Sequence, residues 1–359
     1  MSEDKLCDLD KVTVKSFVGH HDDVSCCAFT SDWKLLATGA DDATLRLWDM
    51  IENKAIHTMA AHTKSIKCIC FSYNNDKIAS GGADWLVFIW DVKTGILLQT
   101  LKGHVSSVES VCFSRSALFV CSGSWDYTAV LWELKSGCPL RILDDHKSVV
   151  QCCCFSHNGD LLATGSWDYK ILLYDIKEYT EISRSHDVES SEMTSYHDVE
   201  SSEITSSHDV ESSEMTHCHD VERCVSRLEL TSVKRNKRSQ KAMVLKYHTS
   251  NIKAVSFSCQ NLLASASWDC NLCIWDTKKG VCLHVLSGHL GFVQACVFSL
   301  SGFFLASASD DETVKIWDVE TGQLLKTLEA YTDEIHQLSF TEDGKLLSSG
   351  PQQVSLCLY

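Results

Sequence analysis

The feature that most constrains the fold is a fixed spacing between single histidines and a later Trp-Asp pair. His20 precedes Trp48 by 28 residues, and the same separation recurs three more times, in His62 to Trp90, His104 to Trp132 and His289 to Trp317. The first four such histidines stand at positions 20, 62, 104 and 146, which are 42 residues apart. A period of this length predicts a repeat protein in which each period forms one supersecondary unit.

Each period contains four short segments in which apolar and polar residues alternate. In the first period they are VSCCAF, KLLATGA, TLRLWD and KAIHTM, and turn sequences such as TSD and DDA separate them. This alternation indicates β-strands, and no period shows the spacing of an amphipathic helix. Four strands in about forty residues are typical of one blade of a β-propeller.

The fine spacing resembles that of the WD40-repeat β-propellers, over about residues 12–359 apart from one insertion. The resemblance implies a buried hydrogen-bonded network in each blade, made of a His, a Ser or Thr, an Asp and the Trp. The matching residues are His20, Thr38, Asp42 and Trp48; His62, Ser80, Asp84 and Trp90; His104, Ser122, Asp126 and Trp132; His146, Thr164, Asp168 and Tyr174, with Tyr in place of Trp; His248, Ser265, Asp269 and Trp275; and His289, Ser307, Asp311 and Trp317. We expect these residues to be structural, because such networks satisfy buried polar groups.

The periods begin near residues 20, 62, 104, 146, 248, 289 and 331 and predict an all-β fold, a seven-bladed WD40 β-propeller. It is expected to span residues 12–359, behind a tail at 1–11. The seventh period keeps only Ser349 of the network pattern and ends at the Trp position. Residues 12–18, VTVKSFV, are therefore expected to supply the missing outer strand and close the ring, since closure removes an exposed strand edge.

One long insertion interrupts the fourth period. The interval from His146 to His248 is 102 residues, 60 more than one period, which places the insert at about 178–239. It begins with a tandem repeat of SHDVESSEMTS and continues into a basic stretch containing KRNKR. Few large apolar residues occur there, so we expect a disordered loop. We favour a repeat expansion that the fold tolerates. The alternatives are phosphorylation of the Ser/Glu repeats, nuclear import through KRNKR, and a metal site at His217, Cys218, His219 and Cys224.

Composition and charge exclude several classes of protein. The 19 Cys and the lack of an apolar N-terminal segment predict a reducing compartment and free thiols. The net charge of −16 opposes a nucleic-acid partner, and no apolar run approaches the length of about 18 residues that a membrane span needs. We therefore predict a cytoplasmic protein, with a nuclear pool as the alternative.

The sequence offers no reaction chemistry. No GxxxxGK, HExxH or GxSxG motif occurs, so we predict no enzyme and no catalytic residue. Nine cysteines in first strands are expected to pack as small apolar side chains and to bind no metal: Cys26, Cys27, Cys68, Cys70, Cys112, Cys152, Cys153, Cys154 and Cys296. No cofactor is expected.

The family resemblance also implies where partners bind. The upper rim of such propellers is lined by the residues three and five after each network His and by the residue before each network Asp. At these positions, the predicted partner-binding residues are Trp125, Trp167, Trp268, Phe292, Asp23, Asp41, Asp310, Glu334, Glu109, Lys67 and Lys253. The three Trp fall on consecutive blades, with acidic residues opposite, which suits a peptide with an apolar anchor and a Lys or Arg. The alternative is that each Trp lies flat and packs on neighbouring turns.

These observations predict a non-catalytic protein–protein interaction scaffold that binds a peptide or protein segment on the top face of the propeller. The alternative is a substrate receptor of a cullin-type ubiquitin ligase, which copurification of adaptor subunits would reveal. The rim set contains no Arg, which weakens a phosphopeptide-binding interpretation. We expect protein partners, no nucleic acid, no membrane, and a monomer within a larger complex.

Overall fold

The computed structural model describes residues 17–179, 241–329, 337–340 and 346–349. The chain forms two compact units, residues 1–175 with 242–359 and residues 176–241, and every described strand lies in the first unit. The predicted tail at 1–11 and almost all of the predicted insert at 178–239 lie outside the described residues. Within the described ranges, no helix has both the length and the apolar content needed to cross a membrane.

Six four-stranded antiparallel sheets build the first unit, and within each sheet the strands pair in chain order. The first sheet contains β1 (Val24–Phe29), β2 (Leu35–Ala40), β3 (Thr44–Asp49) and β4 (Lys54–Ala60). The second contains β5 (Ile66–Phe71), β6 (Lys77–Gly82), β7 (Val87–Asp91) and β8 (Leu97–Leu101). The third contains β9 (Val108–Phe113), β10 (Phe119–Ser124), β11 (Ala129–Glu133) and β12 (Pro139–Leu143).

The other three complete sheets repeat this plan. The fourth contains β13 (Val150–Phe155), β14 (Leu161–Ser166), β15 (Lys170–Asp175) and β16 (Met243–Lys246). The fifth contains β17 (Ile252–Phe257), β18 (Leu262–Ser267), β19 (Asn271–Asp276) and β20 (Val281–Ser287). The sixth contains β21 (Val293–Phe298), β22 (Phe304–Ser309), β23 (Val314–Asp318) and β24 (Leu324–Leu328). The all-β class and the repeated four-stranded unit are thereby confirmed.

The seventh period is described only in part. Here β25 (Gln337–Phe340) pairs with β26 (Leu346–Ser349), and the buried Leu338 and Leu346 belong to a core cluster shared with the sixth sheet. Residues 12–16 of the expected closing strand lie outside the described residues. Phe17 is not in a strand, although it is buried and its ring centroid lies 5.6 Å from that of Trp48. The count of seven blades and the closure of the ring stay predictions.

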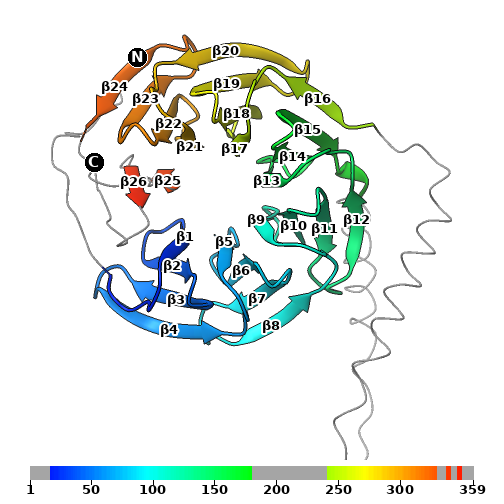
Figure 1. The fold of residues 1–359 in the computed structure, drawn as a ribbon, viewed down its shortest axis with the longest axis vertical. Helices are drawn as coiled ribbons and strands as arrows, with labels where there is room; N and C mark the ends of the chain where they lie inside the picture. The colour runs from blue at the N-terminus through cyan, green and yellow to red at the C-terminus, as the bar shows by residue number, and fades with distance from the viewer. Residues whose placement is uncertain (1–16, 180–240, 330–336, 341–345, 350–359) are drawn as a thin grey trace, which may run out of the picture. The chain divides into compact units, whose positions relative to one another are not determined.

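The first strand of each sheet is the innermost strand of the unit (Figure 1). The strands β1, β5, β9, β13, β17, β21 and β25 surround a common centre, each contacts the next, and β25 also contacts β1. Because strands alternate in direction within a sheet, the turns between second and third strands lie at the same end as the segments that lead into the first strands. We call this end the upper face.

The hydrophobic core lies between neighbouring sheets. One cluster, for example, joins Leu45 and Leu47 of the first sheet to Ile66 and Ile78 of the second. Close approach of the sheets requires small residues on the second strands. A Cβ atom added at Gly81 would lie 2.6 Å from Cγ1 of Val108 in the next sheet, and Gly39, Gly123 and Gly165 approach the following sheet equally closely.

This packing predicts that Gly81→Ala destabilises the protein. The added methyl group has no room beside Val108, and overpacking of this kind costs about 1–3 kcal/mol. Thermal unfolding should therefore show a lower midpoint for Gly81→Ala than for the wild type. Val108→Ala removes the obstructing methyl groups, so the double variant should lose less than the sum of the two single losses. Additive losses would contradict the proposed contact.

Candidate functional site

A chain of hydrogen bonds runs from Trp to Asp within the third sheet. The indole Nε1–H of Trp132 donates to Oγ of Ser122 at 2.8 Å. Nε2 of His104 lies 2.7 Å from the same Oγ, and Nδ1 lies 2.8 Å from Oδ2 of Asp126. An indole nitrogen can only donate, so the hydroxyl must pass its own proton to Nε2 of His104, and Nδ1–H must donate to the carboxylate. Every polar group in this buried chain thus has a partner of the right kind.

The carboxylate at the end of the chain holds the upper turn. Asp126 accepts hydrogen bonds from the amides of Val105 and Thr128 at 3.1 and 3.0 Å and from the hydroxyl of Thr128 at 2.6 Å. The same chain from Trp to Asp occurs in four other sheets, with the residues His20, Thr38, Asp42 and Trp48; His62, Ser80, Asp84 and Trp90; His248, Ser265, Asp269 and Trp275; and His289, Ser307, Asp311 and Trp317.

The fourth sheet has an incomplete chain. His146 hydrogen-bonds Thr164 and Asp168 at 2.8 and 3.2 Å, as in the other sheets. Tyr174, which stands at the Trp position, is buried, and its hydroxyl group has no hydrogen-bond partner. A Tyr ring therefore fills the space of the indole ring without replacing its donated hydrogen bond.

The network lowers the pKa of its acidic groups. Burial alone would raise the pKa of Asp311, but hydrogen bonds from Thr313, the amide of Leu290 and His289 lower it to about 2. The same balance lowers the pKa values of the other network carboxylates, Asp42, Asp84, Asp126, Asp168 and Asp269. Burial lowers the pKa values of His20 and His289, and hydrogen bonds to their Asp partners only partly offset it.

Backbone hydrogen bonds bring two of the predicted rim positions together on each sheet. The amide of Trp125 donates to the carbonyl of Ser107 at 2.9 Å, and those of Trp167 and Trp268 donate to the carbonyls of Val149 and Asn251 at 3.0 Å. The same bond joins Asp41 to Asp23, Ala83 to Ser65, and Asp310 to Phe292. The residue before each network Asp is therefore held at a fixed place on the upper face.

Four of these rim residues form a continuous row of aromatic rings, which we call the aromatic row. Ring centroids lie 5.1 Å apart between Trp125 and Trp167, 6.0 Å between Trp167 and Trp268, and 5.2 Å between Trp268 and Phe292. The end members Trp125 and Phe292 are 44% and 46% exposed, whereas Trp167 and Trp268 are half-buried. The row crosses the third to sixth sheets and presents apolar surface to solvent.

The polar rim residues are more fully paired than the sequence suggests. Nζ of Lys67 lies 3.1 Å from Oδ1 of Asp41, and Gln294 donates to Asp310 at 2.8 Å. Ser107 donates to Glu109 at 2.8 Å, whereas the Asp23 side chain is exposed. Glu334 lies outside the described residues. Of the acidic rim residues that the structure describes, Asp23 is thus the one whose carboxylate most directly faces solvent.

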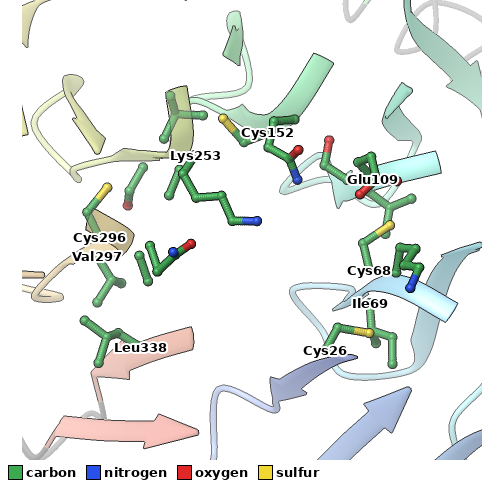
Figure 2. Close-up of a pocket in the computed structure, with 18 of the residues that line it drawn as sticks. Cys26, Cys68, Ile69, Glu109, Cys152, Lys253, Cys296, Val297 and Leu338 are labelled. Atoms are coloured by element: carbon green, nitrogen blue, oxygen red, sulfur yellow. The ribbon is translucent and has the colours of Figure 1, made fainter. Parts of the chain in front are cut away.

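Beneath the rim, the inner strands enclose a cavity of about 310 Å³ (Figure 2). The third rim position of every complete sheet lines it, namely Ser25, Lys67, Glu109, Gln151, Lys253 and Gln294. Lys253 extends into the cavity (Figure 2), and its ammonium group makes no hydrogen bond or ion pair with another described residue. Burial lowers the pKa of Lys253, while the charge of Glu109 opposes this shift. The cavity can thus offer a single positive charge to a bound group.

The structure also shows exposed aromatic residues that the rim pattern did not include. Trp85, Tyr127 and Tyr169 directly follow the network Asp on three consecutive sheets and are 47%, 51% and 48% exposed. All three have positive φ angles, between 66° and 72°, which are unusual for aromatic residues. Their recurrence every 42 residues was the signal in the sequence that would have identified them.

Fourteen cysteines of the described part carry free thiols, whereas Cys138 is disulfide-bonded, which departs from the expectation of free thiols throughout. Cys273, of the pair Cys270 and Cys273, is buried. Three other thiols, those of Cys112, Cys121 and Cys153, lie close together. Sequence reasoning treated Cys112 and Cys153 as separate packing residues and did not consider Cys121.

Repeated four-stranded sheets around a common centre, each with the same buried His–Asp chain, define a β-propeller-like repeat protein. A family model described as "WD domain, G-beta repeat" matches six segments, 11–49, 53–91, 95–133, 137–175, 239–276 and 280–318. These segments cover well over half of the chain, so the protein belongs to the WD40-repeat family. A comparison with curated proteins gave no match. The family indicates a protein–protein interaction scaffold; its members are generally non-catalytic and typically bind protein partners.

The network predicts opposite effects of two similar substitutions. Trp132→Phe removes the indole donor and some ring volume, and it should cost about 1–3 kcal/mol because Ser122 loses a buried partner. Tyr174→Phe removes only a hydroxyl group that has no partner, so stability should be unchanged or higher. Thermal unfolding of both variants tests this contrast. Equal destabilisation would mean that the indole hydrogen bond is unimportant.

The lowered pKa values predict a loss of stability in acid. A group whose pKa is lower in the folded state stabilises the fold above its unfolded pKa, and this contribution is lost as the pH falls. His20 and His289 should therefore begin to reduce stability below pH 6.5, and the network Asp residues below pH 3.8. Unfolding midpoints measured from neutral pH downward should fall in both ranges. A midpoint that stays constant as the pH falls from neutral toward about 5 would contradict the role given to the histidines.

Proposed function

We propose that this protein is a non-catalytic scaffold that binds a peptide or protein segment on its upper face, with the aromatic row as the main contact. The observation that carries the proposal is the continuity of the row: four rings from four successive sheets, with neighbouring centroids 5.1, 6.0 and 5.2 Å apart. A ligand that lies along it can contact several rings at once.

The chemistry of the row favours a partner with an apolar anchor. Large aromatic residues are enriched among the residues that dominate binding energy at protein interfaces. Trp268 is stacked against Phe292 at an interplanar angle of 19°, and its indole nitrogen is buried without a hydrogen-bond partner. Trp167 is held in place by a hydrogen bond of 3.1 Å from its indole nitrogen to Gln151. A rigid apolar surface of this kind loses little entropy when a partner binds.

The charges favour a basic residue beside that anchor. The chain carries a net charge of −16, which attracts cationic partners. On the rim, the exposed Asp23 is the carboxylate best able to contact a Lys or Arg of the partner, since Asp41 and Asp310 already have partners. The Lys67 ammonium neutralises Asp41, so the acidic half of the rim is weaker than the sequence alone suggests.

The remaining parts of the proposal concern the whole chain. We infer a ring of seven blades closed by the N-terminal segment, acting as a monomer within a larger complex and located in the cytoplasm. We further infer that neither nucleic acid nor membrane is a partner. Segments such as KSFVGHHDDVSCCAFTSD also resemble WD repeat-containing protein 38, which adds a relative but no activity to the proposal.

We predict that Trp125→Ala/Trp167→Ala/Trp268→Ala abolishes partner binding. Affinity purification with quantitative mass spectrometry should identify proteins that are recovered with the wild type and lost with the triple variant. Peptides selected by display against the wild type and counter-selected against the variant should contain an aromatic or aliphatic anchor next to a Lys or Arg.

The matched control is Trp85→Ala/Tyr127→Ala/Tyr169→Ala, which removes three exposed aromatic residues from neighbouring positions of the same face. Both variants must first melt like the wild type. Partners that persist in the first variant and vanish in the control would move the site to the outer aromatic residues and contradict the proposal. Recovery of cullin adaptor subunits would instead support the ligase-receptor alternative.

A further inference from the structure

Three cysteine side chains meet between the third and fourth sheets. Cys112 of β9 and Cys121 of β10 are direct cross-strand partners, and Cys153 of β13 approaches them from the next sheet. The three Sγ atoms all lie within 4.8 Å of one another, and those of Cys112 and Cys153 are 3.4 Å apart. No other group of three possible metal-ligating side chains this close together occurs among the described residues.

The repeat itself shows that Cys121 is not needed for packing. The residue before the network Ser or Thr is alanine in each of the other five complete sheets, and all five alanines are fully buried: Ala37, Ala79, Ala163, Ala264 and Ala306. A methyl group is therefore sufficient at this position. The one cysteine stands where two more sulfur atoms converge, so the departure from the repeat and the cluster coincide.

We propose that Cys112, Cys121 and Cys153 form a binding site for a thiophilic divalent metal ion such as Zn²⁺. Zinc–sulfur bonds are about 2.3 Å long, so three sulfur ligands of one ion lie about 3.8–4.0 Å apart. The separations in the cluster lie on both sides of this range, and shifts of less than about 1 Å would bring the three sulfur atoms to it. Soft thiolate ligands also select zinc over the harder magnesium and calcium ions.

The surroundings supply a second contact and a route of entry. The hydroxyl group of Ser110 donates to Sγ of Cys153 at 3.3 Å, and Ser110 also lines the central cavity. An ion can thus reach the cluster from the cavity, and Ser110 or a water molecule can occupy a fourth ligand position. Three protein ligands with one open position are a common zinc arrangement.

The protonation states determine how binding depends on pH. Hydrogen bonds from Cys112 and Cys121, together with Ser110, lower the pKa of Cys153 well below its ordinary value of 9.0, whereas burial raises the pKa values of Cys112 and Cys121. One thiolate is therefore available, and a divalent ion must displace two protons from the other two thiols. The product carries a net charge of −1, and its formation is favoured by higher pH.

The decisive variant is Cys121→Ala, because it restores the residue that every other complete sheet carries. We expect the wild type to bind one equivalent of Zn²⁺ that Cys121→Ala binds at least about a hundredfold more weakly, since even residues that merely support metal ligands change affinity 10–100-fold. Co²⁺ titration should give sulfur-to-cobalt charge-transfer absorption in the wild type and much less in the variant. Cys112→Ala, which copies Ala28 of the first sheet, provides a second ligand variant in case Cys121→Ala does not fold.

The matched control is Cys296→Val, which replaces a buried thiol outside the cluster with the residue found at the same position of the third and fifth sheets. It should bind Zn²⁺ and Co²⁺ as the wild type does. Native mass spectrometry gives the stoichiometry of each protein. Equal binding by wild type and Cys121→Ala would overturn the proposal and assign the metal to other residues of the chain. A wild type that takes up no tight equivalent would overturn it as well.

Discussion

The rest of the structure depends on the hydrogen-bonded chain from Trp to Asp within each sheet. An indole, a hydroxyl, an imidazole and a carboxylate would each be costly to bury alone. Joined in the order of Trp132, Ser122, His104 and Asp126, each donor finds an acceptor and the cost is avoided. The carboxylate then gathers the amides of the upper turn, so a buried network determines the shape of an exposed loop.

This arrangement separates the residues that hold the upper face from those that define its chemistry. The residue before each network Asp is positioned by its backbone amide, and its side chain is free to vary. The chain uses this freedom unevenly, with Asp41 and Ala83 on the first two sheets and Trp125, Trp167 and Trp268 on the next three. Variable side chains on a rigid frame are what a recognition surface requires. The aromatic row is therefore the feature in which this chain departs most usefully from its own repeat.

Much of the fold could be predicted because its information is local and repeated. Strand alternation and the constant spacing of His20 to Trp48 predict four-stranded units without knowledge of any tertiary contact. The adjacency of Trp125 and Trp167 followed from the same period. Their ring distances could not be predicted, because they depend on how side chains on different sheets orient.

What the sequence could not reveal depends on contacts between neighbouring sheets. The ion pair of Lys67 with Asp41 joins two sheets, and it removes a carboxylate that a rim pattern counts as available. Strand alternation correctly separates Cys152 from Cys153. It does not show that Cys153 meets two sulfur atoms of the preceding sheet, because that requires the distance between sheets.

The most direct test of the central claim is ¹⁹F NMR of protein labelled with 5-fluorotryptophan, titrated with a peptide selected on the wild type. The chain has 10 Trp, and the network Trp residues serve as internal controls. We predict that the resonances of Trp125, Trp167 and Trp268 shift in proportion to binding while those of the buried Trp132 and its counterparts stay unchanged. Shifts confined to Trp33 or Trp85, with the aromatic row unaffected, would contradict the account.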